Sequence, residues 1–176
     1  MSEIYGLMAE FGDPTSLVEA AEKTREAGYK KIDAYSPFPI EELSEAVGMH
    51  WNAVPLVVLC GGLFGGLSGY LMQWWISVVS YPVNIGGRPF HSWPSFIIVT
   101  FEMTILFAGI AAVFGMFALN GLPMPYHPVF NVEKFEHASK DKFFLIIFSS
   151  DAKYDGAETR RFLEGLKPQS VSEVPR

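Results

Sequence analysis

The segment PLVVLCGGLFGGLSGYLMQWWISVV, from Pro55 to Val79, is the strongest indication of the fold class of this chain. It contains no Asp, Glu, Lys, Arg or His, and a helix of this length, rising about 1.5 Å per residue, crosses a hydrocarbon layer roughly 30 Å thick. A second run, Ser95 to Leu119, is equally long and has one charged residue, Glu102. Buried soluble helices are the weaker alternative, because a domain of this size could not cover two such segments. We predict transmembrane helices over 55–79 and 95–119.

The charges on either side of the two predicted spans indicate their orientation. Four Lys and Arg residues precede the first span, eight follow the second, and only Arg88 lies between them. Cytoplasmic segments of membrane proteins are enriched in Lys and Arg, so both termini are expected in the cytoplasm. Residues 80–94 then form an extracytoplasmic loop. The N-terminal sequence also lacks the basic and apolar regions of a secretory signal. We therefore expect a multi-pass protein of a bacterial cytoplasmic (inner) membrane.

Outside the spans, the chain alternates between predicted strands and helices. Strands are expected at 4–11, 31–35, 143–148 and 171–174, with helices at 14–28 and 155–166, the second begun by a capping box of Asp155 and Glu158. This order is that of a ferredoxin-like βαββαβ domain. The fold class is therefore α+β, with the transmembrane hairpin inserted between strands 2 and 3.

The predicted domain boundaries follow from this insertion. Residues 1–48 form the first half of the cytoplasmic domain, 49–120 the hairpin, and 121–176 a linker and the second half. Short amphipathic pieces at 40–47 and 132–138 are expected to connect the domain to the bilayer surface.

The first span contains a double row of glycines. In a helix, small residues four apart lie on one side and let another helix approach closely, which is a main source of attraction between helices in lipid. Ala108, Ala111, Ala112 and Gly115 could serve the same purpose in the second span. The two helices could pack on each other through this face, or the width of the double row could receive a further partner helix. The predicted helix-packing face comprises Gly61, Gly62, Gly65, Gly66 and Gly69.

Several classes of function find no support in the sequence. The formal net charge of −6 argues against binding to nucleic acid. A single cysteine, Cys60, cannot form an intrachain disulfide or a cysteine-based cluster. No glycine-rich phosphate-binding motif follows a strand. The histidines, which are widely separated and predict no metal site, are His50, His91, His127 and His137.

Glu102 is the candidate functional residue that physical chemistry singles out. An ionised carboxylate in the bilayer costs at least a few kcal/mol unless it is paired, hydrated or protonated. It could form a structural hydrogen bond to a neighbouring helix, or act as a proton relay or an acid close to a quinone. Arg88 and His91 in the outer loop are candidates for contacts with a partner surface or lipid headgroups. No catalytic, cofactor-binding or metal-ligating residue is predicted.

The chain resembles the ActD family of bacterial alternative complex III, a quinol:electron-acceptor oxidoreductase. The resemblance extends over nearly the whole length and is specific because many short motifs follow one another at fixed positions. They are IYGLMAEF (4–11), EAGYKKIDAYSPFP (26–39), YPVNIGGRPFHSWPSF (81–96), VTFE (99–102), ALNGLPMPYHPVFNV (118–132) and SEVPR (172–176).

The resemblance implies an accessory membrane subunit that is not an enzyme by itself. Haem c, iron-sulfur clusters and quinol are then expected in partner subunits, with none held by this chain. The implied partners are the other subunits, especially ten-helix quinol-handling core subunits, together with membrane lipids. The implied role is to stabilise the complex, with a contribution to a proton pathway left open. The alternative function is that of a free-standing, membrane-tethered domain that senses a small ligand.

Overall fold

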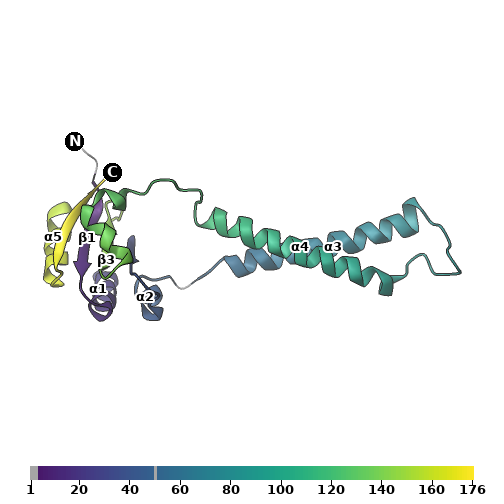
Figure 1. Ribbon diagram of the computed structural model, residues 1–176, viewed down its shortest axis with the longest axis horizontal. Helices are drawn as coiled ribbons and strands as arrows, with labels where there is room; N and C mark the ends of the chain where they lie inside the picture. Colours follow the sequence, from purple (N-terminus) through teal and green to yellow (C-terminus); the bar gives the residue numbers. More distant parts are fainter. Residues whose placement is uncertain (1–3, 50) are drawn as a thin grey trace. The chain divides into compact units, whose positions relative to one another are not determined.

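The computed structural model describes residues 4–49 and 51–176, so the prediction for His50 lies outside the described residues. The chain divides into two compact units. One is the helical hairpin, residues 52–124, and the other, called the domain from here on, combines the chain before and after it. The α+β class expected from the sequence is confirmed, with one four-stranded antiparallel sheet and two long apolar helices (Figure 1).

The sheet of the domain is built from both halves of the chain. Its strands are β1 (Ile4–Phe11), β2 (Ile32–Tyr35), β3 (Phe143–Phe148) and β4 (Ser170–Pro175). The spatial order is β2-β3-β1-β4, with antiparallel pairing throughout. β1 and β3 lie in the middle, where Gly6 pairs with Phe148 and Phe11 with Phe143. Residues far apart in the sequence therefore form the centre of one sheet.

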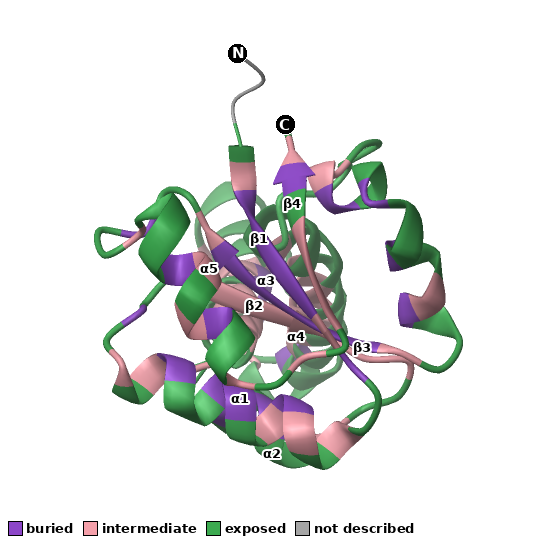
Figure 2. Ribbon diagram, turned by 90° about the vertical axis from the view of Figure 1, so that its left-hand side faces the viewer, coloured by how far each residue is buried: buried purple, intermediate pink, exposed green. Residues whose placement is uncertain are grey.

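Both faces of this sheet are covered, because side chains alternate between the two sides of each strand. On one face, Leu7, Leu145 and Ile147 pack with α1 (Pro14–Glu26) and α5 (Gly156–Gly165). On the other, Met8, Phe144 and Ile146 pack with residues from 129–138. Figure 2 shows buried residues concentrated on β1 and β3. The apolar run FFLIIF is thus buried on both sides, as a central strand requires.

The helix ends follow the sequence signals, with one correction. Asp13 caps α1 by accepting a hydrogen bond from the Ser16 backbone N–H at 2.8 Å, and Gly28 follows its end with a φ of +96°, which favours glycine. Asp155 caps α5 by accepting from Ala157 and Glu158 N–H. However, the Asp155 N–H donates to the hydroxyl of Thr159 and not to Glu158. The prediction that Glu158 completes a capping box is therefore wrong, because Thr159 accepts the bond expected for Glu158.

The two amphipathic pieces pack on the domain itself. α2 (Glu41–Ala46) buries Leu43 and Ala46 in the core that contains α1. The second piece is two short 3₁₀ helices, Pro128–Asn131 and Glu133–Ser139, which bury Val129, Phe135 and Ala138 in the core on the other face. These apolar side chains therefore face the cores of the domain. A connection of the two pieces to the bilayer surface stays a prediction.

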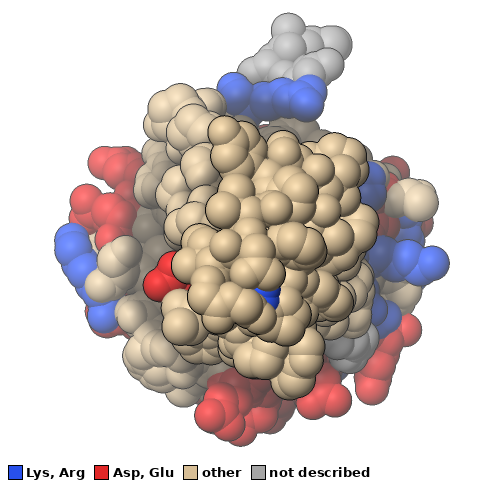
Figure 3. Space-filling view, turned by 90° about the vertical axis from the view of Figure 1, so that its right-hand side faces the viewer, with Lys and Arg blue, Asp and Glu red and all other residues tan. Residues whose placement is uncertain are grey.

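The hairpin consists of two antiparallel helices that lie side by side (Figure 1). α3 (Val54–Trp74) continues without a break as a π-helical segment, Trp75–Ser80, and α4 spans Trp93–Leu119. Both are long and apolar enough to cross a membrane. In Figure 3, which looks onto the looped end of the hairpin, the surface of the hairpin itself is almost free of charged side chains.

Candidate functional site

The seam between α3 and α4 is made of small residues. A β-carbon at Gly65 would collide with the backbone oxygen of Met103 and the Cβ of Phe107, and one at Gly61 would collide with the Cβ of Ala111. At Gly62 the nearest atom, the Cβ of Ala108, would be 3.5 Å away, an ordinary contact. Gly61 and Gly65 therefore permit the closest approach of the two backbones, while Gly62 has room for a methyl group.

A shallow groove runs beside this seam. Its volume is about 540 Å³, and its residues are small or aliphatic apart from one threonine. The hydroxyl of that residue, Thr104, donates to the backbone oxygen of Thr100 at 2.7 Å. The glycine rows are thus partly covered by α4 and partly open to this groove. Reception of a further partner helix here stays a prediction. The lining residues are Val58, Leu59, Gly62, Leu63, Gly66, Leu67, Thr104 and Ala108.

Gln73 in α3 is a polar residue that the hairpin accommodates within itself. Its side-chain amide donates to the backbone oxygens of Gly69, at 3.1 Å, and of Phe96, at 3.0 Å. The second of these bonds joins α3 to α4. A buried amide without partners is costly in lipid, and here its N–H groups have acceptors inside the helix pair.

Glu102 lies on the opposite side of α4 from this seam. Ala111, which faces Gly61 of α3, is nine residues further along the chain, or about 180° around a helix of 3.6 residues per turn. Glu102 is accordingly exposed on the outside of the helix pair. Across the described residues, 4–49 and 51–176, its carboxylate has no hydrogen-bond or ion-pair partner. The hairpin therefore does not supply the partner that this carboxylate requires in lipid.

The two outer-loop candidates have partners inside the hairpin. His91 Nε2 lies 2.7 Å from the hydroxyl of Tyr70, and its ring packs against those of Tyr70 and Phe96. Arg88 donates a hydrogen bond to the hydroxyl of Ser95. These contacts fix the loop on the ends of α3 and α4. Contacts of Arg88 and His91 with a partner surface or with lipid stay predictions.

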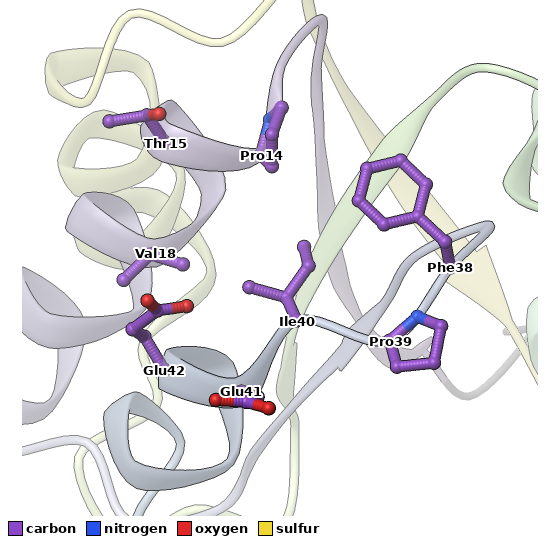
Figure 4. A pocket seen from close by; sticks show the side chains of 8 residues that line it. All are labelled: Pro14, Thr15, Val18, Phe38, Pro39, Ile40, Glu41 and Glu42. Carbon is purple, nitrogen blue, oxygen red and sulfur yellow. The ribbon is translucent and has the colours of Figure 1, made fainter.

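The domain carries a groove at the N-terminal end of α1, shown in Figure 4. It has a volume of about 650 Å³ and lies between Pro14, Thr15 and Val18 on one side and the segment from Phe38 to Glu42 on the other. Phe38 is 50% exposed and its ring packs on Phe143, 5.6 Å away between centroids. The groove has apolar walls and two carboxylates at its edge. The sequence did not predict this groove, because residues 14–18 and 38–42 come together only in the folded domain, where α2 packs on α1.

A buried carboxylate, Asp151, was also missed. It is 7% exposed and accepts hydrogen bonds from the backbone N–H groups of Lys30, Lys31 and Lys153 at 2.6–2.8 Å. Burial alone would raise its pKa, but the three N–H donors together outweigh burial and hold the pKa below its usual value. Asp151 therefore joins the segment before β2 to the loop after β3. Its partners are backbone groups, and no residue type signals them.

The two other histidines among the described residues have different neighbours. His127 Nε2 lies 3.4 Å from the hydroxyl of Tyr5, and His137 lies beside Glu136 and Asp141 on the surface. Within the described residues, no three side chains of His, Cys, Asp or Glu are grouped so as to hold a metal ion.

A comparison with models of protein families gives a match. The family described as alternative complex III, ActD subunit, matches residues 5–173 of the chain. The match includes both halves of the domain and the whole hairpin. No curated protein matches the chain.

Proposed function

The chain belongs to the ActD subunit family of alternative complex III, and is therefore a membrane protein of an electron-transport complex; on this premise we propose that it is a cofactor-free accessory subunit. Its role is to anchor a ferredoxin-like cytoplasmic domain, divided by the inserted hairpin, and to stabilise a quinol-oxidising assembly whose partner subunits carry haem c and iron-sulfur clusters.

The observation that carries this proposal is the construction of the hairpin. The two helices are closely packed along a seam of glycines, yet their outer surfaces consist of large exposed apolar side chains. A rigid helix pair of this kind is suited to fixing a domain at a membrane. The scattered positions of Cys60 and of the described histidines, His91, His127 and His137, support the cofactor-free part of the proposal, because a resident metal or haem needs ligands that converge.

Purification of the complex through an affinity tag on this chain tests the proposal. We expect haem-bearing subunits and membrane subunits to elute together with the tagged chain, with the absorption spectrum of c-type haem. A stable assembly of this chain alone would contradict the accessory role. It would favour the alternative of a free-standing ligand sensor, whose binding site would be the groove between Pro14 and Glu42.

The orientation is part of the same proposal, with both termini in the cytoplasm. Alkylation of single cysteines in intact cells tests it. We expect a cysteine in place of Asn84, in the outer loop, to react with a reagent that does not cross the membrane, and a cysteine in place of Ser172 to be protected. The reverse pattern would contradict the orientation.

A contribution of Glu102 to a proton pathway is a second candidate function. The observation in its favour is the carboxylate without a partner on the outside of α4, among the residues that the structure describes. In purified complex, the variant Glu102→Gln is expected to lower quinol turnover or proton movement into vesicles. Full turnover with unchanged proton movement in a normally assembled complex would exclude this role.

A further inference from the structure

The outer face of α4 combines Glu102 with a glycine that meets nothing in the described part of this chain. Gly109 follows Glu102 by seven residues, so the two lie on the same side of the helix about two turns apart. A β-carbon added at Gly109 would have no atom within 4 Å, in contrast to every glycine of the seam. Ile98 and Leu106, beside them, are 67% and 53% exposed. We call Ile98, Glu102, Leu106 and Gly109 the Glu102 face.

This face is unsuited to direct contact with lipid chains. Glu102 lies about 14 Å from the first residue of α4 along the helix axis, too deep for a glutamate side chain to reach the headgroups easily. Hydrocarbon offers no hydrogen-bond donor, so a carboxylate there costs several kcal/mol, whether it is ionised or forced to protonate. The hairpin cannot provide the donor, because the seam with α3 lies on the opposite side of α4.

The chemistry of the face specifies what covers it. The carboxylate requires a hydrogen-bond donor at its own depth, and the open glycine two turns away permits the close approach of another backbone. At this depth a backbone must satisfy its own hydrogen bonds, which restricts a neighbouring segment to a helix. We propose that the Glu102 face binds a transmembrane helix of a partner subunit, which presents a donor side chain to Glu102 and packs across Gly109. This inference rests on the proposed function as a subunit, and it names the surface and the chemistry of the contact.

The first test compares variants of the tagged chain in the purified complex. Glu102→Ile removes the acceptor and Gly109→Leu blocks the close approach. We expect each to lower the amount of membrane partner subunit retained per tagged chain after detergent washing, by about three- to tenfold, the size of an interhelical hydrogen bond or packing contact in membranes. Glu102→Gln keeps an acceptor oxygen and is expected to retain more partner than Glu102→Ile.

The matched control is Cys60→Leu. Cys60 is exposed on α3, and it lies nine residues before the buried Gly69, hence about half a turn from the seam. Its substitution enlarges an exposed residue in the same way as Gly109→Leu, and it is expected to leave the partner content unchanged. Equal amounts of each variant in the membrane show that the chain itself still inserts and accumulates.

A second measurement identifies what covers the face. A photo-reactive phenylalanine derivative in place of Ile98 is expected to form an adduct with a membrane subunit of the purified complex, whereas the same group in place of Leu71 on α3 is not. Adducts with lipid alone, or with a second copy of this chain, would overturn the proposal, as would full retention of partners in both Glu102→Ile and Gly109→Leu. Elution of the wild-type chain with haem-bearing subunits would in that case still support the proposed function.

Discussion

The domain and the hairpin differ in where their polar side chains lie. In the described part of the domain, the buried polar residues Thr24, Asp151 and Thr159 each have a hydrogen-bond partner in the domain, whereas the buried Tyr154 hydroxyl and Arg160 Nε have none. In the hairpin, Gln73 is satisfied inside the helix pair, but Glu102 lies outside it. Large apolar side chains follow the same division, being mostly buried in the domain and mostly exposed along α3 and α4.

This difference reflects two solvents. Water drives apolar side chains of the domain into cores on both faces of the sheet, so most large apolar side chains of the domain are covered within it. Lipid gives α3 and α4 no such drive, and their association depends on close backbone contact at glycines. An exposed leucine is therefore normal on the hairpin, whereas an exposed carboxylate is the exception that indicates a partner. The following predictions test this contrast, in order of decreasing expected effect.

The same leucine truncation is expected to have different effects in the two regions. Leu145 is fully buried in β3, so Leu145→Ala should destabilise the domain by about 2–5 kcal/mol. Leu67 in α3 is 63% exposed, and Leu67→Ala should cost far less. Hydrogen exchange of the β3 and α3 amides in the detergent-solubilised full chain measures both changes. Similar losses of protection for the two variants would contradict the proposed difference between the domain and the hairpin.

A methyl group is expected to separate the helices at one glycine and to be tolerated at another. Gly65→Ala places a β-carbon against the Met103 backbone oxygen, which cannot move aside without a shift of α4, at a cost of about 1–3 kcal/mol. Gly109→Ala, on the open side of α4, is the control and should leave the helix pair intact. The measurement is the thermal unfolding of the full chain in detergent, followed by circular dichroism. Equal midpoints for both variants would show that the seam is looser than these contacts indicate.

The domain is expected to lose local stability in acid through Asp151. Its pKa is lowered on folding, so its contribution is fully present above the unfolded value of about 3.9 and is lost as the pH falls through the folded value. Protection of the Lys31 amide against exchange should fall in this range. Asp151→Asn leaves one backbone N–H without an acceptor, at a cost of about 1–2 kcal/mol, and should remove most of the pH dependence. A wild-type pH profile in this variant would assign the acid sensitivity to another group.

The smallest expected effect concerns the start of α5. Asp155→Ala removes the acceptor of two backbone N–H groups. The local stability that protects the first amides of α5 against hydrogen exchange should fall by about 1 kcal/mol. Glu158→Ala should have almost no effect, because Thr159 and not Glu158 returns the bond to Asp155. The exchange rate of the Ala157 amide, compared between the two variants, distinguishes their effects. A larger loss of protection for Glu158→Ala would show that Glu158 does take part in a capping box.

Much of the fold could be predicted because its signals are local. The runs 55–79 and 95–119 are almost free of charge over a membrane thickness, and FFLIIF is a short apolar run typical of a central strand. The packing of the amphipathic pieces on the domain was not predicted. Their periodicity shows that one side is apolar but not what it faces, and Leu43 and Phe135 pack in the cores of the domain.

The candidate site was only half predictable. The type and position of Glu102 follow from the sequence, and so does its cost in lipid. Its direction does not, since it depends on which side of α4 meets α3, and Gly109 gains meaning only once that side is known. The bonds of Asp151 to the backbone N–H groups of Lys30 and Lys31, and the groove beside Phe38, have no sequence signal, because they join segments far apart in the chain.

The order of residues was enough to predict that two helices of this chain can cross a membrane, that the segments before and after them form an α+β domain, and that one carboxylate lies within a span. These predictions depend on the composition of consecutive residues and on the free energy of transferring them from water to lipid. The packing of α3 on α4 was needed to show that Gly61 and Gly65 lie in the contact between the two helices, that a β-carbon at Gly109 would meet no atom of the described chain, and that Glu102 faces outward. The physical reason is that all sides of a single apolar helix can face lipid. Which side is covered depends on where a second helix packs against it.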